Sequence, residues 1–220
     1  SFIGIVACIE AHKQKKKYMI EMVTCPLDSL SNHGGIVYKV LAPIISLINK
    51  KLVKRAKYVR YVTEEFLQNR YPTNGMGFSC SDVRINKMDE SVLEKRINKI
   101  INDNNTYKLG LIGSLDVNFK GHDVLIKAVS LIKQYNVEVH FLGLGNKERW
   151  QQLINEYNIH EKIFFDGTLP SGEKVWNWLD ELDIFVMPSL QEGLPRSLVE
   201  AMSRACPCIG TPTGGIPELV

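Results

Sequence analysis

The second half of this sequence alternates short apolar runs with amphipathic stretches, and this alternation restricts the fold more than any other feature. Apolar runs such as KLGLIG and VEVHFLG have the length of buried strands, and stretches with helical periodicity follow them. The pattern predicts strands at residues 107–113, 137–143, 162–167, 183–189 and 207–210. It predicts helices at residues 121–135, 147–157, 173–182 and 194–205. Strands and helices at this spacing form βαβ units, so residues 107–220 are predicted to form a doubly wound parallel sheet, a Rossmann-like α/β domain.

Residues 1–85 predict a second, smaller α/β arrangement. The predicted elements are a helix to about residue 11, strands at 18–23 and 58–62, a long helix through residue 57 between them, and a short helix after Thr63. The segment PLDSLSNHGG, which follows the first strand, is predicted to be a loop. Two strands cannot close a sheet of their own, so this part is expected to be the incomplete tail of a second Rossmann-like domain.

The segment at residues 71–106 separates the two parts. It opens with YPTNGMGFS, whose proline and glycines interrupt regular structure, and it closes with the polar run INDNNT. We place the domain boundary here, with an interdomain linker at residues 86–106. The final residues, GTPTGGIPELV, indicate a loop and a helix start, so the second domain is expected to be truncated at its C-terminus.

The net charge of +3 conceals a strong asymmetry along the chain. Between His12 and Arg60, eleven lysines and arginines accompany two acids, which gives +9 there and −6 elsewhere. Such a basic part indicates contact with an anionic surface, such as lipid headgroups or a lipid diphosphate, although a solvated helix face explains it equally well. Nucleic acid is disfavoured as a partner because aromatic residues do not interleave with the basic ones and no recognised motif is present.

The cysteines and the apolar segments exclude several classes. The five cysteines have neither paired C-x-x-C spacing nor the density of a disulfide scaffold, so free buried thiols are expected, with no disulfide and no metal site. No apolar run reaches the roughly 20 residues that cross a bilayer, and the apolar start lacks a basic leader and a cleavage site. A cytoplasmic location is therefore expected.

The loops after the predicted strands are the candidate ligand-binding segments, because ligands of open α/β sheets bind beyond the carboxyl ends of the strands. These loops are GSLDVNFKG, GLGNKE, DGTLP, PSLQEGLPRSLVEA and GTPTGGIPE. Three of them are rich in glycine, which lets the backbone approach a ligand closely. The sequence GLGNKE has Glu148 where the third glycine of G-x-G-x-x-G belongs, which disfavours a dinucleotide-dependent oxidoreductase.

Two glutamates, Glu192 and Glu200, invite comparison with the carboxylate pair of a glycoside hydrolase. Eight residues along a helix would separate their backbones by roughly 12 Å, which is longer than either hydrolase geometry. Two contacts along an extended ligand such as a nucleotide sugar fit this spacing better. In that interpretation the diphosphate lies over Gly193 and Leu194, at the start of a helix.

The segment from Pro188 to Val220, with its E-x7-E spacing, resembles the signature of retaining glycosyltransferase family 4, which has the GT-B fold and belongs to the glycosyl transferases group 1. The preceding segments KGHDVLIKA, FLGLG, FFDG and DIFVMPS resemble their counterparts in the same order. The resemblance is strong over residues 109–220 and weak before them. It implies that residues 107–220 are the donor-binding domain and that residues 1–85 belong to the acceptor-side domain.

The activity implied by this resemblance is the transfer of a hexose-like sugar from a UDP- or GDP-sugar, without metal or cofactor. The implied acceptor is a glycan or a polyprenyl-linked sugar, and the implied setting is bacterial surface polysaccharide synthesis at the inner face of the membrane. The fragment is expected to be inactive alone. A nucleotide-sugar-binding module without turnover is the alternative.

The resemblance also assigns roles to matching residues. Glu192 would bond hydroxyls of the donor sugar, and Glu200 would bond the ribose hydroxyls. Gly193 and Leu194 would offer backbone N–H groups to the diphosphate. Lys120 would be the cation that stabilises the charge growing on the leaving phosphate, as a point contact beside the helix N-terminus.

One position departs from the family pattern. Ser114 follows the glycine that ends the first strand, where the family usually carries an arginine, so half of the cationic clamp is missing. Either Lys120 acts alone, or another cation such as Arg196 replaces the missing arginine, or activity is weak or absent.

Base recognition and acceptor contacts are assigned more loosely. The resemblance points to backbone groups at residues 165–169, including Phe165 and Asp166, as readers of the base, although Asp166 fits an ordinary turn residue equally well. Trp176 and Trp178, two apart on the next helix and therefore on different faces, are expected to pack rather than to form a stacking platform. Asp28 and His33 lie in the loop after the first strand and are candidates for the interdomain cleft, although a structural role for His33 fits as well.

Overall fold

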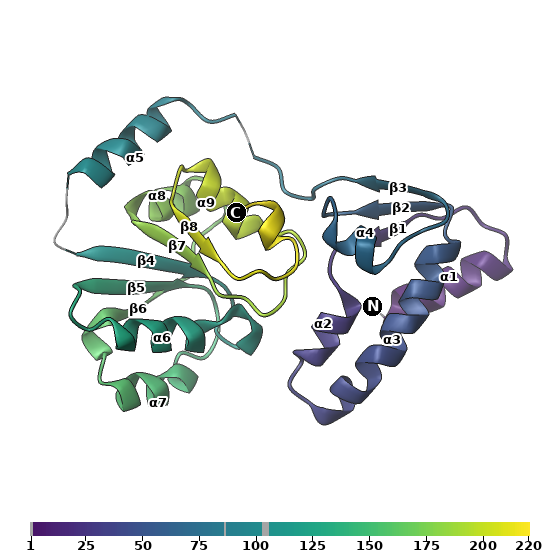
Figure 1. Cartoon of the computed structure of the whole chain (residues 1–220), viewed down its shortest axis with the longest axis horizontal. Coiled ribbons are helices and arrows are strands. Elements are labelled where there is room, and N and C mark those ends of the chain that lie inside the picture. Colours follow the sequence, from purple (N-terminus) through teal and green to yellow (C-terminus); the bar gives the residue numbers. More distant parts are fainter. Residues whose placement is uncertain (1, 86, 103–105) are drawn as a thin grey trace. The chain divides into compact units, whose positions relative to one another are not determined.

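The computed structural model describes residues 2–85, 87–102 and 106–220, and it divides into two compact units. Unit 1 comprises Ser1–Arg84, Gln191–Pro195 and Pro212–Leu219, and unit 2 comprises Ile85–Leu190, Arg196–Thr211 and Val220. Each unit contains its own parallel β-sheet (Figure 1). The predicted α/β class with parallel sheets is therefore confirmed.

The sheet of unit 2 has five parallel strands in the order β6-β5-β4-β7-β8. The strands are β4 (Tyr107–Ile112), β5 (Val137–Leu142), β6 (Ile163–Gly167), β7 (Ile184–Met187) and β8 (Cys208–Gly210). Residue Leu109 pairs with Val139 on one side and with Ile184 on the other, which places β4 at the centre. All five strands predicted from the apolar runs are present.

The helices of unit 2 cover both faces of this sheet. They are α6 (His122–Leu131), α7 (Glu148–Tyr157), α8 (Glu173–Glu181) and α9 (Arg196–Ser203). Figure 1 shows α6 and α7 on one face and α8 and α9 on the other. The core between α6, α7 and the strands contains Ile126, Val139, Phe141 and Ile154, all essentially without solvent exposure. Burial of these side chains is the main stabilising contribution, at roughly 1.5–3 kcal/mol for each large apolar residue.

The predicted linker at residues 86–106 contains a helix that the sequence analysis did not predict, α5 (Ser91–Ile101). The buried Arg96 donates from Nη2 to the carbonyl oxygen of Leu179 at 3.0 Å and from Nη1 to that of Leu182. The Lys99 ammonium donates to the same carbonyl oxygen of Leu182 at 2.9 Å. Carbonyl groups at the end of a helix have no partners within it, so these two cations hold α5 against the C-terminal end of α8.

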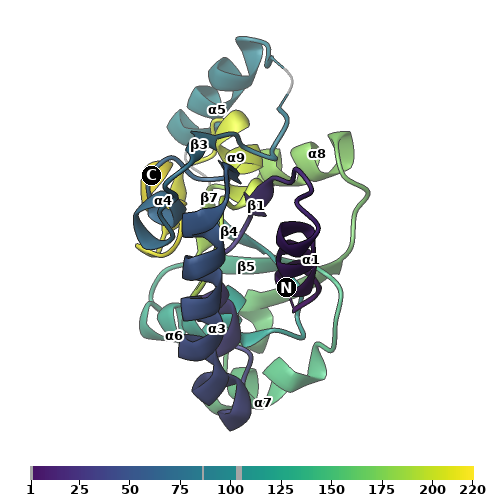
Figure 2. The same ribbon diagram turned by 90° about the vertical axis from the view of Figure 1, so that its right-hand side faces the viewer.

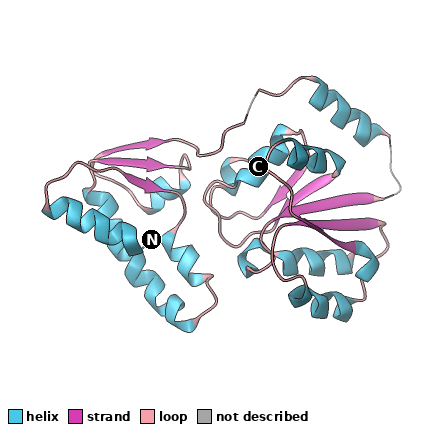
Figure 3. Ribbon diagram, turned by 180° about the vertical axis from the view of Figure 1, so that it is seen from behind, coloured by secondary structure: helices cyan, strands magenta, loops and turns pink. Residues whose placement is uncertain are grey.

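The sheet of unit 1 has three parallel strands in the order β1-β2-β3. The strands are β1 (Ile20–Met22), β2 (Tyr58–Tyr61) and β3 (Met76–Ser79), and the helices are α1 (Phe2–Lys13), α2 (Pro26–Ser31), α3 (Ile36–Arg55) and α4 (Phe66–Arg70). Helix α1 packs against α3 (Figure 2), and Figure 3 shows the strands of both sheets in magenta. No helix of the described residues is long and apolar enough to span a bilayer.

Two expectations for unit 1 are wrong. The prediction of only two strands missed β3, whose residues 76–79 are all exposed, follow Gly75 and include Gly77, so they lack the apolar run that marks a buried strand. The segment predicted to be a loop after β1 contains α2 instead. This helix starts with Pro26 at its first position and with Cys25 as its cap, whose sulfur accepts from Asp28 N–H at 3.5 Å.

The core of unit 1 contains two tyrosines that are polar at one end. The buried Tyr61 hydroxyl donates to the carbonyl oxygen of Tyr71 at 2.7 Å, and the Tyr71 hydroxyl lies 2.9 Å from Ser46 Oγ. Burial raises the pKa of Tyr71 to about 12. Both tyrosines therefore stay neutral and serve as partly apolar core residues with satisfied hydroxyls.

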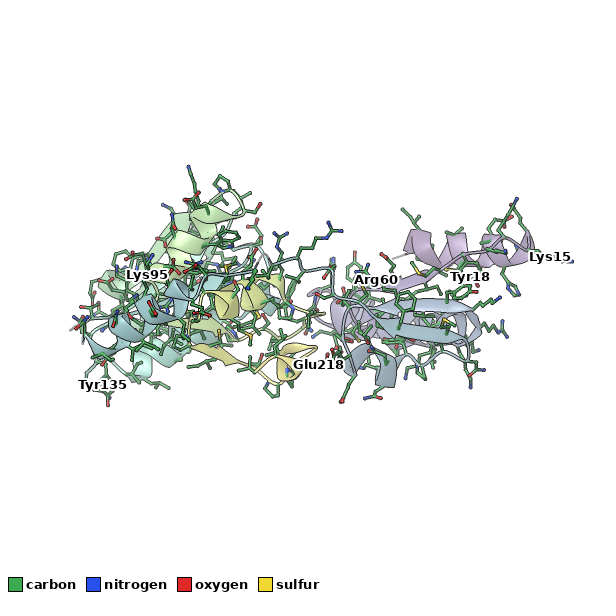
Figure 4. All side chains as sticks on the ribbon, turned by 90° about the horizontal axis from the view of Figure 1, so that it is seen from above. Lys15, Tyr18, Arg60, Lys95, Tyr135 and Glu218 are labelled. Carbon is green, nitrogen blue, oxygen red and sulfur yellow. The ribbon has the colours of Figure 1, made fainter. Side chains whose placement is uncertain are left out.

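The segment Pro212–Leu219 contributes a carboxylate to the start of α4. The Glu218 side chain accepts hydrogen bonds from the backbone N–H groups of Glu64 at 2.6 Å, Glu65 at 3.1 Å and Phe66 at 2.8 Å. Figure 4 labels this side chain. A carboxylate at this place satisfies N–H groups that have no partner within the helix. The interaction is a helix cap supplied by a residue more than 150 positions away along the chain.

Candidate functional site

The strand order of unit 2 has a topological switch point between β4 and β7. The chain continues from β4 to β5 on one side and from β7 to β8 on the other. The loops that follow β4 and β7 therefore diverge, and a ligand can bind between them at the carboxyl end of the sheet. The loop after β4 covers residues 113–121, and the loop after β7 begins at Pro188. A hydrogen bond from Leu190 N–H to the carbonyl oxygen of Phe119, at 2.7 Å, joins the two loops. The candidate site of unit 2 lies at this edge.

Lys120 is positioned by two glycines. A Cβ at Gly113 would lie 2.9 Å from Lys120 Cγ, so the lysine side chain runs directly over the end of β4. Gly121 has a φ of +77°, and a Cβ there would lie 2.1 Å from the carbonyl oxygen of Pro188. A larger residue would have to push the two loops apart. The backbone around Lys120 is therefore fixed by close approach of backbone to backbone.

Ser114 lies in the same loop, and its hydroxyl accepts a hydrogen bond from Asp116 N–H at 3.3 Å. The guanidinium of Arg149, from the first turn of α7, donates to the carbonyl oxygen of Asp116 and to Asn118 Oδ1. Arg149 is thus a cation attached to the loop that lacks the family arginine. The sequence analysis missed it, because its place in the first turn of a helix after GLGNKE gave no sign of a contact with residues 116–118.

Arg196 and Glu200 form an ion pair on α9. Arg196 Nε lies 3.0 Å from Glu200 Oε1, and Glu200 is 8% exposed while the arginine side chain is 63% exposed. The helix begins at Arg196, two residues later than predicted, because Leu194 precedes Pro195 and the residue before a proline is disfavoured in the helical conformation. The prediction that Gly193 and Leu194 form the helix start is therefore wrong. The unpaired N–H groups at the start of α9 belong to Arg196 and the residues after it.

The loop residues Glu192, Gly193 and Leu194 belong to unit 1, within Gln191–Pro195. A Cβ at Gly193 would lie 2.0 Å from the carbonyl oxygen of Val23, so only glycine fits there. The carbonyl oxygen of Gly193 accepts from Gly215 N–H at 2.8 Å, and Leu194 packs against the core of unit 1.

The base-reading residues have partners within unit 2. The Asp166 carboxylate lies 3.0 Å from His140 Nδ1 and accepts from Trp178 Nε1 at 2.7 Å. Phe165 packs against the core with its ring 5.6 Å from that of Phe141. The Asp166 side chain is therefore occupied by β5 and α8, which favours its interpretation as a structural residue, and Trp178 contributes to this network.

The two candidates for an acceptor cleft also have partners within unit 1. Asp28 Oδ2 accepts from Arg70 Nη1 at 2.7 Å and lies in α2 rather than in a loop. The His33 ring lies 4.0 Å from the Tyr38 ring. These contacts fit structural roles for both residues.

His122, the first residue of α6, directly follows the loop at residues 113–121 that contains Lys120. The sequence analysis did not single it out as a site residue. The fully buried ring stacks on Trp150 at 5.2 Å and meets Phe141 edge-on at 5.0 Å. Burial lowers its pKa to about 4, and the nearby charges of Arg149 and Lys120 contribute in the same direction. The imidazole is therefore neutral near pH 7 and packs as part of the core beneath Lys120.

These loops and the two parallel sheets define an α/β protein with a basic, glycine-bounded loop at a topological switch point, a place where such folds bind phosphorylated ligands. The family model described as "Glycosyl transferases group 1" matches residues 106–220, more than half of the chain. The chain belongs to the glycosyl transferases group 1 family.

One relative extends the similarity over the whole chain. "Protein CapJ" of Staphylococcus aureus is 35% identical over 223 residues, which covers 100% of this chain and 55% of that protein. "Amylovoran biosynthesis glycosyltransferase AmsK" of Erwinia amylovora is 34% identical over 110 residues, 46% of this chain and 27% of that protein. The chain spans about half the length, or less, of the curated relatives it matches.

Solved structures show the fold. The crystal structure of Anabaena Alr3699/HepE in complex with UDP has a TM-score of 0.70 and 17% identity, over 98% of this chain and 59% of that one. Sucrose-phosphate synthase from Thermosynechococcus elongatus has a TM-score of 0.70 and 15% identity, over 96% of this chain and 55% of that one. The predicted fold class, α/β of the GT-B type with Rossmann-like parallel sheets, is confirmed.

Proposed function

We propose that the protein is a retaining glycosyltransferase of family 4 that transfers a sugar from a nucleotide-diphosphate sugar to a glycan or a polyprenyl-linked acceptor. Its setting in this proposal is bacterial surface polysaccharide synthesis in the cytoplasm, at the inner face of the membrane. The family membership supports glycosyl transfer, and the relative named for amylovoran biosynthesis supports a polysaccharide product.

The observation that carries this proposal is the geometry of the loop after β4. Its lysine lies over the end of the central strand, and Gly121 holds that loop against Pro188 of the loop after β7. A cation fixed at the switch point of a doubly wound sheet suits the diphosphate of a nucleotide sugar. The free N–H groups at the start of α9, in the same unit, suit the same anion.

In this mechanism, cleavage of the bond between the anomeric carbon and the diphosphate leaves negative charge on the departing nucleoside diphosphate. Lys120 and the first N–H groups of α9 stabilise that charge as it develops, which lowers the barrier without a metal ion. Glu200 bonds the ribose hydroxyls. The family resemblance assigns the hydroxyls of the donor sugar to Glu192 and the diphosphate to backbone groups of Gly193 and Leu194, three residues that belong to unit 1.

Because Ser114 replaces the family arginine, the proposed mechanism lacks one cation beside the diphosphate. Arg196 is the cation expected to replace it, but its guanidinium is paired with Glu200 at 3.0 Å. In our proposal the pair persists while the ribose is bound, so that Lys120 supplies most of the positive charge. Ser114 then contributes a hydroxyl where related enzymes contribute a guanidinium.

The donor base is proposed to be uracil, since the similar Anabaena structure contains UDP, with a GDP-sugar as the alternative donor. Backbone groups at Phe165 and Asp166 are the proposed base contacts. The side chain of Asp166 keeps its bonds to His140 and Trp178 in this arrangement.

The decisive experiment is calorimetric titration of the full chain with UDP and with GDP, with and without magnesium. Binding of one nucleotide without metal is expected, and Lys120→Ala and Glu200→Ala should each weaken it roughly tenfold, the loss of a charged hydrogen bond. Lys127→Ala and Glu156→Ala are matched controls, because both residues are exposed on helices of the same unit. The proposal is wrong if neither nucleotide binds, or if the control variants weaken binding as much as the site variants.

A nucleotide-sugar-binding module without turnover is the second candidate, and Ser114 is the observation that favours it. The two functions differ in one measurement, which is release of nucleoside diphosphate from a bound donor by the complete protein in the presence of acceptor lipid extract. Ser114→Arg restores the family's residue, so an enzyme limited by that position should gain turnover in this variant. A binding module should stay inactive with either residue.

A further inference from the structure

The geometry points to a phosphate-binding site in unit 1, in a basic hollow at the C-terminal ends of α1 and α3. The ligand class is a phosphate or diphosphate group, either dissolved or carried by a lipid headgroup. The site does not depend on the donor site proposed above, because it uses none of the residues of the loops in unit 2.

The hollow has a volume of about 470 Å³ and is lined by His12, Lys54, Arg55, Ala56, Lys57, Asn74 and Gly75. Four of these seven residues carry basic side chains, and no acidic residue is among the described residues that line the hollow. It lies within the basic part of the sequence, and Figure 4 labels Lys15 in the turn that follows α1. The excess of positive charge at residues 12–60 is therefore partly concentrated around one concave site.

The cations around the hollow are available to a ligand. Within the described part of the chain, the side chains of Lys54 and Arg55 have neither a hydrogen-bond partner nor an ion-pair partner. The Lys57 ammonium lies 5.3 Å from the centroid of the Tyr58 ring, a contact that leaves its charge uncompensated. Like charges that converge without an anion repel each other, and a concave surface of one sign concentrates counter-ions.

The backbone at this place would normally disfavour an anion, since the last carbonyl groups of a helix carry partial negative charge. Here the oxygen of Lys54, in the last turn of α3, and those of Ala56 and Lys57, which follow the helix, already accept hydrogen bonds. The oxygen of Lys54 accepts from Asn74 N–H at 3.1 Å, that of Ala56 from Thr73 Oγ1 at 2.9 Å, and that of Lys57 from Met76 N–H at 2.8 Å. The segment at residues 73–76 thus compensates the negative end of α3.

The floor of the hollow is rigid because Gly75 lies directly on the end of α3. A Cβ at Gly75 would lie 2.4 Å from the carbonyl oxygen of Ala56 and 2.5 Å from that of Lys57. Only glycine allows this approach, which holds residues 74 and 75 in the lining of the hollow, while the Gly75 N–H donates to Thr73 Oγ1 at 3.0 Å.

The test uses the full chain and follows the backbone amide of Gly75 by NMR, which reports this hollow and not the loops of unit 2. Inorganic pyrophosphate is one probe, and phosphatidylcholine vesicles with and without phosphatidylglycerol are the other. If the ligand is a dissolved anion, we expect pyrophosphate to shift the Gly75 signal in a saturable way. If the ligand is a lipid headgroup, we expect only the anionic vesicles to remove the Gly75 signal, again in a saturable way. Either result supports the site and identifies its source.

Two double variants separate a built site from diffuse charge. Lys54→Gln with Lys57→Gln removes two cations of the hollow, and Lys39→Gln with Lys51→Gln removes two exposed cations elsewhere on α3. The first pair should raise the dissociation constant about tenfold, and the second by about twofold at most. Equal effects of the two pairs, or no saturable response to either probe, would overturn the proposal. Lys120→Ala should leave the Gly75 response unchanged, so loss of the donor site and loss of this site are distinguishable.

Discussion

The loops of unit 2 and two helices of unit 1 are held in different ways. In unit 2 backbone lies directly on backbone, as where Gly121 meets Pro188 and where a Cβ at Gly143 would lie 1.9 Å from the carbonyl oxygen of Gly113. Unit 1 has such a contact at Gly193, but its helices α4 and α2 are also held by carboxylates, Glu218 at the start of α4 and Asp28 in the first turn of α2. Steric contact tolerates no added atom, whereas a surface charge pair contributes little and is screened by salt. The comparison predicts that a substitution at a close backbone contact costs more than the loss of one of these carboxylates.

The largest effect is expected for Gly121→Ala. A left-handed backbone and a Cβ 2.1 Å from the Pro188 oxygen should together cost about 3 kcal/mol or more in the free energy of unfolding, and nucleotide binding should be lost with the position of Lys120. Gly167→Ala is the matched control, because Gly167 has a φ of +71° and no atom within 4 Å of an added Cβ, so it should cost about 1 kcal/mol. Urea unfolding measures both, and equal costs would show that close approach does not hold this loop.

The next effect is the pH dependence that comes from His122. Its pKa is about 4 in the folded protein and near 6.5 in the unfolded chain, so the unfolded state binds the proton first. The contribution of His122 to the free energy of unfolding is fully present above about pH 6.5. It should decrease by about 3 kcal/mol as the pH drops to about 4, with little further loss from this group at lower pH. Urea unfolding from pH 7 to 4 should give a shallower slope for His122→Phe than for the unchanged chain. An identical slope would show that the ring is accessible to protons in the folded state.

A smaller effect is expected for Glu218→Ala in unit 1. Three backbone N–H groups at the start of α4 lose a charged acceptor and regain only water, which should cost about 2 kcal/mol. Glu64→Ala is the control, since that carboxylate is exposed and should change the stability by less than about 0.5 kcal/mol. If Glu218→Ala costs more than Gly121→Ala, the contrast between close backbone contacts and carboxylates is wrong.

The smallest effect is expected for the ion pair between Asp28 and Arg70. The two side chains are 21% and 33% exposed, so solvent screens their attraction. A double-mutant cycle with Asp28→Asn and Arg70→Gln should give a coupling energy of about 0.5 kcal/mol that decreases with added salt. A coupling above about 2 kcal/mol would mark the pair as more than a surface interaction and would revive Asp28 as a candidate for the acceptor side.

The sequence predicted the strands of unit 2 because each contains an apolar run, and in the central part of the sheet this run is largely buried, as in VEVHFL of β5. It failed for β3, whose four residues are exposed, and for α5, which is held by Arg96 and Lys99 against carbonyl groups of α8. Neither element depends on an apolar pattern of its own. Local periodicity cannot predict contacts between cations and a helix end more than 80 residues away.

For the candidate site, the sequence alone determined which segments follow the strands and which residue types they carry, including Lys120 between glycines and the spacing of Glu192 and Glu200. Tertiary structure decided which of those side chains are already engaged. In the folded protein Arg196 is paired with Glu200, and the Asp166 side chain contacts His140 and Trp178. Arg149 donates to the loop that contains Ser114. The reason is physical: strand order follows from short-range patterns of burial, whereas the partner of a charged side chain depends on which distant segments the completed fold brings within about 3 Å of it.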